Sequence, residues 1–236
     1  GNVKKTSMDQ YDRTRRDGLI AINLKDGDEL ISVKRVAKGE KVIMVSSAGK
    51  AILWDESEAR AMGRGTMGVR GMNVPADAHV LGMEIAKPGT DLFVITEKGY
   101  GKRSALEDYR VTNRGGKGVK TLNITDKTGD LIAIKNVNDD NDLMIINQSG
   151  VAIRLAVNTI KVQGRYTQGV KLIDLGKRGD TIASVCKVDS EEEVAEEEAQ
   201  TGASYISDIS YKSDSSESSE SSDVSDSADQ SDSSEQ

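Results

Sequence analysis

Basic residues recur at matching positions along the 236-residue chain, and most of them stand beside or near a glycine. Arg64, Arg114 and Arg165 each lie four residues before a glycine, and Arg15 or Arg16 takes that place in a shortened first copy. Further basic residues lie next to the same glycines or follow a second set of glycine turns: Arg70, Lys117, Lys120, Lys171, Lys4, Lys5, Lys102, Arg103 and Arg154. Glycines leave backbone N–H groups accessible and let a phosphate chain approach closely. Recurrence at equivalent positions therefore predicts a basic belt that binds nucleic-acid phosphates.

Taken singly, each of these side chains could instead do no more than solvate a turn. If the belt does bind nucleic acid, base reading is not expected, because no stretch has the pattern of a helix that would enter a major groove. Aromatic residues make up only 3% of the chain, which leaves no stacking platform for single strands. Contact with the backbone of a duplex, together with bending of that duplex, suits the belt better.

Two sets of glycines divide the chain into four repeats. The first set opens the repeats and is spaced by 48, 50 and 51 residues: Gly1, Gly49, Gly99 and Gly150. The second set lies inside the repeats: Gly18, Gly68, Gly118 and Gly169. Apart from Gly1, we expect these glycines to be structural residues, and those of the first set to occupy hairpin turns that require positive φ. A repeat of about 50 residues is typical of blade architectures.

Apolar runs between the glycines predict β-strands. One run follows each inner glycine after a polar turn: Leu30–Val36, Val80–Ile85, Leu131–Val137 and Ile182–Val188. Another precedes each hairpin turn: Val42–Val45, Leu92–Ile95 and Leu143–Ile146. These runs are rich in Val and Ile and are bounded by Gly, Asp and Asn, as strands are. The sequence thus predicts an all-β fold of propeller-like blades with four antiparallel strands each, over residues 1–48, 49–98, 99–149 and 150–188.

The ends of the repeat array differ from its middle. Gly1 lies at a hairpin turn whose first strand would precede it, and the fourth repeat lacks its last run, so we expect an open arc that looks cut from a larger ring. Residues 1–188 hold 31 Lys+Arg and 23 Asp+Glu (31 − 23 = +8), whereas residues 189–236 hold 1 and 16 (1 − 16 = −15). The Ser/Asp/Glu-rich segment 189–236 is predicted to be a disordered tail. It is also expected to compete with DNA for the belt.

Catalytic chemistry finds no support in the residue types. The chain has one histidine, His79, and one cysteine, Cys186, which cannot form a zinc site by themselves. No Gly-x-x-x-x-Gly-Lys-Ser/Thr loop and no repeated pair of carboxylates is present. We therefore expect no catalytic residue, no metal, no cofactor and no small-molecule substrate in this chain. A single cysteine and the absence of an 18-residue apolar run favour a cytoplasmic protein without a membrane span.

Several segments in order resemble the C-terminal domain of the bacterial protein DNA gyrase A. The resemblance covers residues 1–188 and is carried by Gly1-Asn-Val-Lys-Lys-Thr6, Gly27-Asp-Glu-Leu-Ile31, Arg60-Ala-Met-Gly63, Thr66-x-Gly-Val-Arg-Gly71, Gly99-Tyr-Gly-Lys-Arg103 and Gly164-Arg-x-Thr-Gln-Gly-Val170. It implies a β-pinwheel, in which neighbouring blades exchange strands, and a basic edge that wraps duplex DNA. The implied partners are DNA, the rest of gyrase A, and gyrase B, in a heterotetramer that supercoils DNA negatively. ATP and Mg²⁺ would then be bound by other parts of that enzyme.

The chain also departs from the family pattern. Arg114-Gly-Gly-Lys-Gly118 looks like the family's glycine-rich box but lies in a later repeat and lacks the preceding Gln-Arg, so the full role of the box is not transferred to it. No tyrosine here matches the family's active-site tyrosine. Two alternatives remain: the related domain of topoisomerase IV, which wraps DNA weakly, and a propeller-like protein-interaction module.

Overall fold

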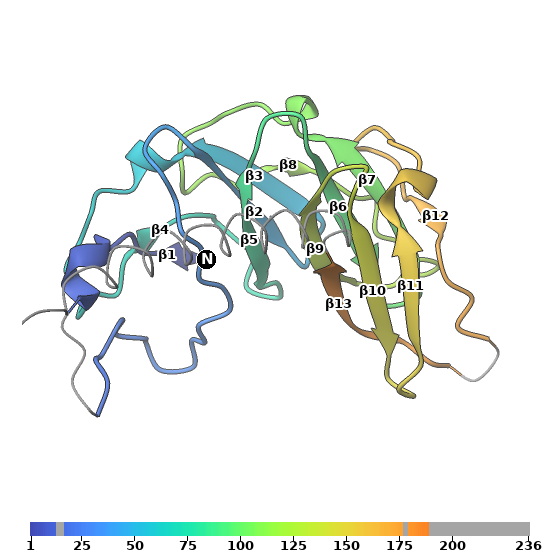
Figure 1. Ribbon diagram of the computed structural model, residues 1–236, viewed down its shortest axis with the longest axis horizontal. Helices are drawn as coiled ribbons and strands as arrows, with labels where there is room; N and C mark the ends of the chain where they lie inside the picture. Colours follow the sequence, from blue (N-terminus) through green and yellow to red (C-terminus); the bar gives the residue numbers. More distant parts are fainter. Residues whose placement is uncertain (13–16, 177–178, 189–236) are drawn as a thin grey trace, which may run out of the picture. The chain divides into compact units, whose positions relative to one another are not determined.

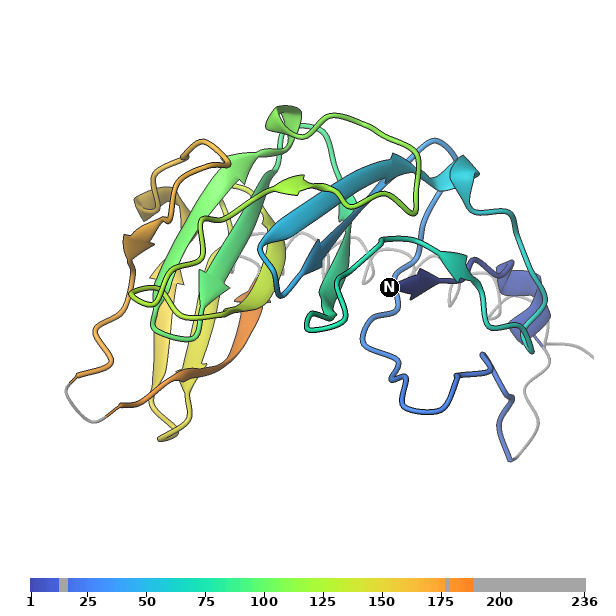
Figure 2. The same cartoon turned by 180° about the vertical axis from the view of Figure 1, so that it is seen from behind.

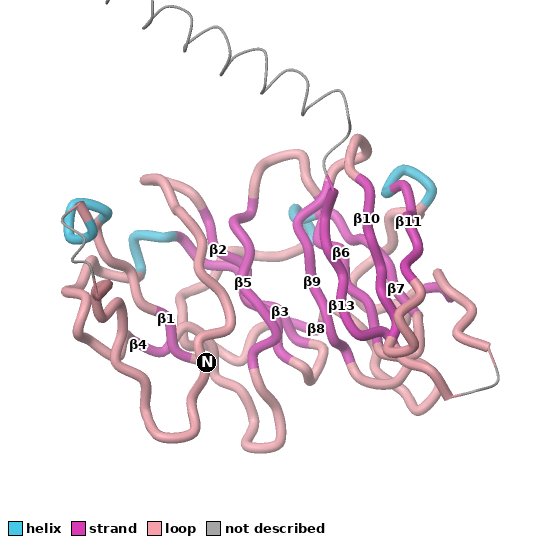
Figure 3. The backbone as a smooth tube through the Cα atoms, turned by 60° about the horizontal axis from the view of Figure 1, so that its bottom comes forward, coloured by secondary structure: helices cyan, strands magenta, loops and turns pink. Residues whose placement is uncertain are grey.

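The structure is a computed structural model, and it describes residues 1–12, 17–176 and 179–188. Its described part is built from short strands, joined by loops and by 3-10 turns of three or four residues (Figures 1 and 3). The strands are β1 Asn2–Val3, β2 Lys41–Ser46, β3 Lys50–Asp55, β4 Val69–Arg70, β5 Val80–Ala86, β6 Asp91–Thr96, β7 Tyr100–Ala105, β8 Val119–Lys120, β9 Leu131–Val137, β10 Asp142–Asn147, β11 Ala152–Ala156, β12 Val170–Lys171 and β13 Ile182–Val188. The 3-10 turns are η1 Met8–Tyr11, η2 Glu56–Glu58, η3 Leu106–Asp108 and η4 Val157–Thr159. In the described residues, no helix has the length and apolarity that a membrane span needs.

Strand exchange between neighbouring repeats organises the sheets. Two four-stranded antiparallel sheets have the orders β5-β2-β3-β8 and β9-β6-β7-β12. In each, the fourth strand is two residues long and comes from the following repeat. The pair β1-β4 repeats this exchange, and β13-β10-β11 forms a three-stranded sheet. The prediction of all-β blades with exchanged strands is therefore confirmed, and the sheets follow one another in chain order (Figure 1).

Apolar side chains on both faces of the central strands hold neighbouring sheets together. Along β2, Ile43 and Val45 pack into a core shared with Leu92 and Val94 of β6. The alternate residues of β2 enter a second core with Met72 and Trp54. Those of β6 enter a third core with Leu143 and Ile145. A strand that is buried on both faces reads as a continuous apolar run, which is why these runs stand out in the sequence.

The predicted strand Leu30–Val36 does not form, which corrects that part of the prediction. The segment has no regular structure, and Leu30, Ile31 and Val33 are exposed. Its counterparts β5, β9 and β13 each pair with a strand that precedes a hairpin turn, namely β2, β6 and β10. Leu30–Val36 does lie against β5, because Ser32 Oγ donates to the carbonyl of Met83 over 3.4 Å and Lys34 pairs with Glu84 over 2.8 Å. Within the described residues, however, no strand pairs with this segment, so its apolar residues do not form a strand.

The hairpin glycines Gly49, Gly99 and Gly150 have positive φ, as predicted. The inner glycines have positive φ as well, so that all seven values lie between 69° and 85°: Gly18, Gly49, Gly68, Gly99, Gly118, Gly150 and Gly169. At the last two inner glycines the close approach of two chain segments adds a second requirement. A Cβ on Gly118 would lie 2.5 Å from the carbonyl oxygen of Ala51, and one on Gly169 would lie 2.6 Å from that of Gly101. These two glycines therefore let their exchanged strands lie directly against the preceding hairpins, whereas nothing lies within 4 Å of a Cβ on Gly18.

Candidate nucleic-acid interface

Three loops, which we call the arginine loops, carry the predicted arginines: residues 59–68, 109–118 and 160–169. Each loop crosses the hairpin strand of the preceding repeat and is bonded to it at both ends. At the first end the backbone amides of Met62, Thr112 and Gln163 each donate to a hairpin-strand carbonyl over 2.8 Å. At the second end the exchanged strands β4, β8 and β12 pair with β1, β3 and β7. The loops are thus fixed on the sheets at equivalent places (Figure 2).

The three arginines make the same backbone contact. Arg114 donates from Nη1 to the carbonyl of Arg70 over 2.8 Å, and Arg165 donates from Nη1 to the carbonyl of Lys120 over 3.1 Å. Arg64 reaches the carbonyl of Ile20, the equivalent position of the first repeat, over 3.4 Å. Arg114 and Arg165 therefore lie against Arg70 and Lys120, the basic residues on the exchanged strands of the repeats before them. Arg64 makes the same contact with Ile20, which lies in a segment without regular structure. At the two later junctions basic residues of successive repeats are brought together.

These contacts define a continuous basic row, consisting of Arg64, Arg70, Arg114, Lys117, Lys120, Arg165 and Lys171. Within the described part of the chain, Lys171 is the member with an ion pair, to Asp174 over 2.6 Å, and this hydrogen bond raises the pKa of Lys171. Arg165 lies against the ring faces of Tyr166 and Tyr109, at 4.8 and 5.7 Å from their centroids. Aromatic faces hold a guanidinium without neutralising it. The row thus presents positive charge that carboxylates of the described residues leave largely uncompensated.

Two of the predicted DNA-binding residues lie inside the protein, which corrects the prediction for them. Lys102 is 0% exposed, and its ammonium donates to backbone and side-chain oxygens of the loop above it. Arg103 is buried, donates from Nε to the carbonyl of Ile160 over 2.5 Å and pairs with Asp91 and Asp139. Strand β7 places both side chains below the loop of the next repeat. Lys102 is buried with three acceptors for its three protons, and the buried Arg103 is directed at acceptors inside the protein, so neither cation is placed to meet a phosphate.

The other basic residues of the hairpin strands are also engaged within the protein. Lys4 donates to the carbonyls of Ala21 and Arg64. Lys5 pairs with Glu56, and Arg154 pairs with Asp142 over 2.6 Å. These three residues keep some exposure, and their contact with DNA stays a prediction. Arg15 and Arg16 lie outside the described residues, as does the whole acidic tail 189–236.

A further basic column was missed in the sequence. Arg60, Arg110 and Lys161 each follow the residue that closes a 3-10 turn, and all three are exposed. They stand at the start of the arginine loops, next to the parallel bridges formed by Ala61, Val111 and Val162. A signal for them is present in the sequence, because each lies eight residues before an inner glycine. The glycines are Gly68, Gly118 and Gly169. They add a second set of positive charges to the same loops.

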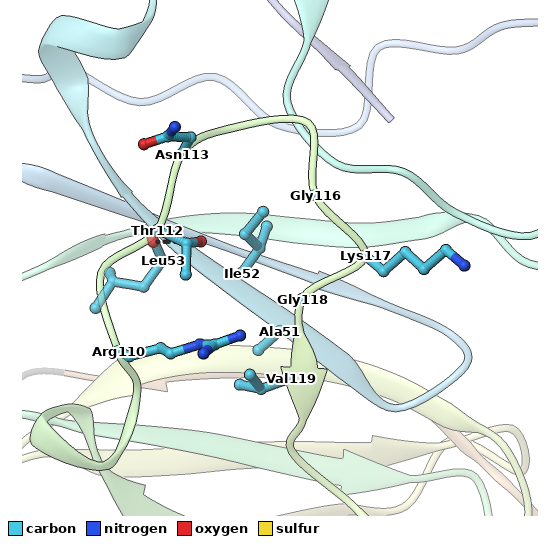
Figure 4. Close-up of a pocket in the computed structure, with 10 residues that line it drawn as sticks. All are labelled: Ala51, Ile52, Leu53, Arg110, Thr112, Asn113, Gly116, Lys117, Gly118 and Val119. Atoms are coloured by element: carbon cyan, nitrogen blue, oxygen red, sulfur yellow. Dashed lines mark hydrogen bonds between the residues drawn. The ribbon is translucent and has the colours of Figure 1, made fainter.

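The middle arginine loop covers a hollow of about 250 Å³. Its floor is apolar and includes Ile52 and Leu53 of β3, and its rim includes Gly116 and Lys117 (Figure 4). Arg110 extends across the hollow, whereas the Lys117 side chain points away from it. No group of three metal-ligating side chains occurs in the part of the chain that the structure describes. The chemistry of the loops is thus that of cations and backbone amides.

Comparison with known proteins gives consistent results. The family model described as "DNA gyrase C-terminal domain, beta-propeller" matches residues 1–37, 40–87, 90–138 and 141–187. The last three segments begin nine residues before the predicted boundaries at 49, 99 and 150 (49 − 40, 99 − 90 and 150 − 141). With these segment boundaries, the strands β2, β3 and β5, which belong to one sheet, also belong to one matched segment.

Curated relatives include DNA gyrase A of Staphylococcus aureus (strain NCTC 8325 / PS 47), which is 40% identical over 205 residues, covering 85% of this chain and 23% of that protein. DNA gyrase A of Staphylococcus epidermidis (strain ATCC 12228 / FDA PCI 1200) is 38% identical over 195 residues, covering 82% and 22%. The chain thus spans less than a quarter of the length of these relatives. Two solved structures are similar in fold. The C-terminal domain of DNA topoisomerase IV has a TM-score of 0.76 at 26% identity, covering 81% of this chain and 60% of that one. The DNA gyrase A C-terminal domain has a TM-score of 0.67 at 28% identity, covering 73% and 58%.

Proposed function

The chain belongs to the DNA gyrase C-terminal domain family, and from this premise we propose that its basic row binds duplex DNA without sequence specificity. The observation that carries the proposal is the contact of each loop arginine with the backbone of the preceding repeat, two residues after the inner glycine of that repeat. Because this contact recurs from repeat to repeat, the cations form a track rather than isolated points. A track of cations suits a regularly charged polymer such as the DNA backbone.

We further propose that DNA bends along the row and wraps on it. The arginine loops offer positive charge and glycine backbone but no element that could enter a major groove, so phosphate contacts would supply the affinity. Bending costs elastic energy, of order 1–6 kcal/mol for a 20–30 base-pair site. Contacts distributed over successive repeats could offset this cost, since each repeat adds its own arginine and lysine.

In the whole protein, this domain would act as a non-catalytic part of gyrase A within a type II topoisomerase. It would present wrapped DNA to the remainder of gyrase A and to gyrase B, and so support ATP-dependent negative supercoiling in the bacterial cytoplasm. ATP and Mg²⁺ would be bound elsewhere in that enzyme. The acidic tail, with a net charge of −15 (1 Lys and 16 Asp+Glu), would compete with DNA for the row, because covalent attachment raises its effective concentration.

Charge reversal in the arginine loops tests the proposed DNA binding. Binding of a fluorescent duplex of about 150 base pairs, about one persistence length, is measured for the wild type and for the triple variant Arg64→Glu, Arg114→Glu and Arg165→Glu over a range of salt. Affinity falls as salt rises, and we call the steepness of this fall, on logarithmic scales and as a positive number, the salt slope. Each lost phosphate contact should lower the salt slope by about 0.9. Energy transfer between labelled duplex ends reports bending in the same samples.

The matched control reverses three exposed lysines in turns outside the arginine loops, Lys38, Lys87 and Lys98. It makes the same change in net charge, so a purely global charge effect would act on both variants alike. The proposal predicts that the control keeps most of the wild-type slope. Equal slopes for the two triple variants would refute a specific role of the arginine loops. A chain that ends after Val188 should bind more tightly at low salt if the tail competes.

A further inference from the structure

Lys102 is a buried cation that direct DNA binding does not use. Its ammonium donates to the carbonyls of Gly164 and Arg165 over 2.7 and 2.8 Å and to Oγ1 of Thr167 over 3.2 Å. An ammonium has three protons, and these three acceptors all lie in the arginine loop 160–169, more than 60 residues further along the chain. The side chain thus reaches up from β7 and holds the loop from below.

The first junction between repeats has the same arrangement. Lys4 is the fourth residue from Gly1, as Lys102 is the fourth from Gly99. Its ammonium donates to the carbonyl of Arg64 and also to that of Ala21. In both junctions the carbonyl of the loop arginine itself is the acceptor. A carbonyl oxygen that accepts a hydrogen bond from an ammonium is kept away from an approaching phosphate, which it would repel.

The middle junction lacks the lysine. Ile52 occupies the equivalent position on β3, and the hollow of about 250 Å³ lies beneath this loop. Strand β8 nevertheless pairs with β3 through Lys50↔Lys120 and Ala51↔Val119, so strand exchange does not require the lysine. Here the loop arginine is held from a different side, by donation from Arg114 Nε to the carbonyl of Glu58 over 2.8 Å. The role of the lysine must therefore concern the loop rather than the sheet.

A buried ammonium is costly, and an apolar residue is tolerated at the same place in β3. Burial, and after it the charge of Arg165, lowers the pKa of Lys102 to about 8. At neutral pH the side chain therefore still carries most of its charge and all three donors. Buried ionic groups are poor sources of stability compared with apolar residues of similar volume. Their presence points to a contribution to specificity of conformation, here the conformation of one loop.

We propose that Lys102 and Lys4 are positioning residues for DNA binding, which fix the backbone of the arginine loops so that Arg165 and Arg64 stay in the basic row. This inference rests on the proposed function of that row. Neither lysine needs to contact DNA. Loss of the ammonium would release the loop carbonyls, and the arginine would then contribute less to phosphate binding although it is still present.

The test uses the full chain with Lys102→Ile, which installs the residue found at the equivalent place in β3. Duplex binding over a range of salt is compared for this variant, for Arg165→Ala and for the double variant. We expect Lys102→Ile to lower the salt slope by about 0.9, as loss of one phosphate contact does. The double variant should show no further decrease, because both changes remove the same contact. Circular dichroism and the melting temperature establish that the variants are folded.

Arg114→Ala provides the matched comparison, because its loop does not rest on Lys102. Combined with Lys102→Ile, it should lower the slope by the sum of the two separate effects. Wild-type affinity and slope in a folded Lys102→Ile variant would overturn the proposal, as would additivity with Arg165→Ala. If Lys102→Ile does not fold, the comparison is made at the half-exposed Lys4 with Lys4→Met, Arg64→Ala and the double variant. Wild-type affinity and salt slope in Lys4→Met, or additivity with Arg64→Ala, would again overturn the proposal.

Amide hydrogen exchange separates failure of this inference from failure of the proposed function. Exchange is measured without DNA on the peptide that contains residues 164–169. Lys102→Ile should speed exchange there and leave residues 113–118 unchanged. If the wild type binds no DNA, the proposed function fails, but faster exchange would still establish that Lys102 holds the loop. Unchanged exchange in a folded variant would overturn the positioning role whatever the DNA result.

Discussion

Arg165 of the fourth repeat donates a hydrogen bond to the backbone carbonyl of Lys120 in the third, over 3.1 Å. The two residues are 45 apart in the sequence, and strand exchange brings them together, since β8 and β12 pair with neighbouring hairpins. The same contact joins Arg114 to Arg70. Neighbouring cations are therefore set at a spacing fixed by the backbone.

Arg110→Ala should weaken duplex binding and lower the salt slope by about 0.9, if the column Arg60, Arg110 and Lys161 contacts phosphates. The side chain is exposed, so the melting temperature should stay unchanged. Fluorescence anisotropy at several salt concentrations measures the slope. Arg110→Lys keeps the charge and is the control, with a slope close to that of the wild type. A normal slope in the alanine variant would remove this column from the interface.

Gly118→Ala should destabilise the fold by at least about 2 kcal/mol. Gly118 has a φ of 72°, a conformation that costs other residues roughly 1–2 kcal/mol, and the new Cβ would lie 2.5 Å from the carbonyl oxygen of Ala51. Gly116→Ala in the same loop is the control, because its Cβ would meet Ile52 Cδ1 at an ordinary 3.4 Å. Urea denaturation measures both. Similar midpoints for the two variants would show that the close approach of β8 to β3 is not needed.

Arg103→Met should lower the free energy of unfolding by about 3–5 kcal/mol, because it leaves Asp91 and the carbonyl of Ile160 without their buried partner. Burial already raises the pKa of Asp91, and removal of the guanidinium would raise it further. Arg154→Met is the equivalent change in β11. There the ion pair with Asp142 is at the surface, and its loss should cost less than about 1 kcal/mol. Because Arg103 is buried, the folded Arg103→Met variant should keep the wild-type salt slope for DNA binding. A lower salt slope would show that Arg103 does contact phosphates.

The pKa of Lys102 predicts a pH-dependent stability. The ordinary lysine pKa of 10.5 applies to the unfolded chain, whereas the folded protein releases this proton at about pH 8. Between these values the unfolded state binds more protons, so the free energy of unfolding should rise with pH, by at most about 1.4 kcal/mol per pH unit. Below pH 8 both states are protonated and the contribution is constant. The charged groups involved are Lys102 itself, Arg165 and Asp108.

Lys102→Ile isolates this contribution from that of the other lysines and tyrosines. The difference in unfolding free energy between wild type and variant should be flat from pH 6 to 8 and should increase from pH 8 to 10. Urea denaturation at each pH gives the two values. A difference that does not change with pH would mean that Lys102 titrates alike in the folded and unfolded chains.

The sequence by itself determined the repeat, the strands and the loops that carry charge. Continuous apolar runs such as Leu92–Ile95 predicted central strands because both faces of these strands are buried. Gly49, Gly99 and Gly150 predicted hairpin turns that other residues adopt at a cost, since positive φ is a local property of the backbone. Local chemistry of this kind can be read along one repeat and compared with the next.

Only the tertiary structure decided which basic residues are at the surface. Lys102 and Lys120 look alike in sequence, yet the first lies beneath a loop from the next repeat and the second on an exchanged strand above a hairpin. Leu30–Val36 has the composition of its counterparts, yet in the described part of the chain no strand pairs with it. The burial of Lys102 depends on a loop more than 60 residues away, and β5, β9 and β13 pair with strands whose partner residues lie 34 to 46 residues away. The pattern within one short segment carries no record of such distant neighbours.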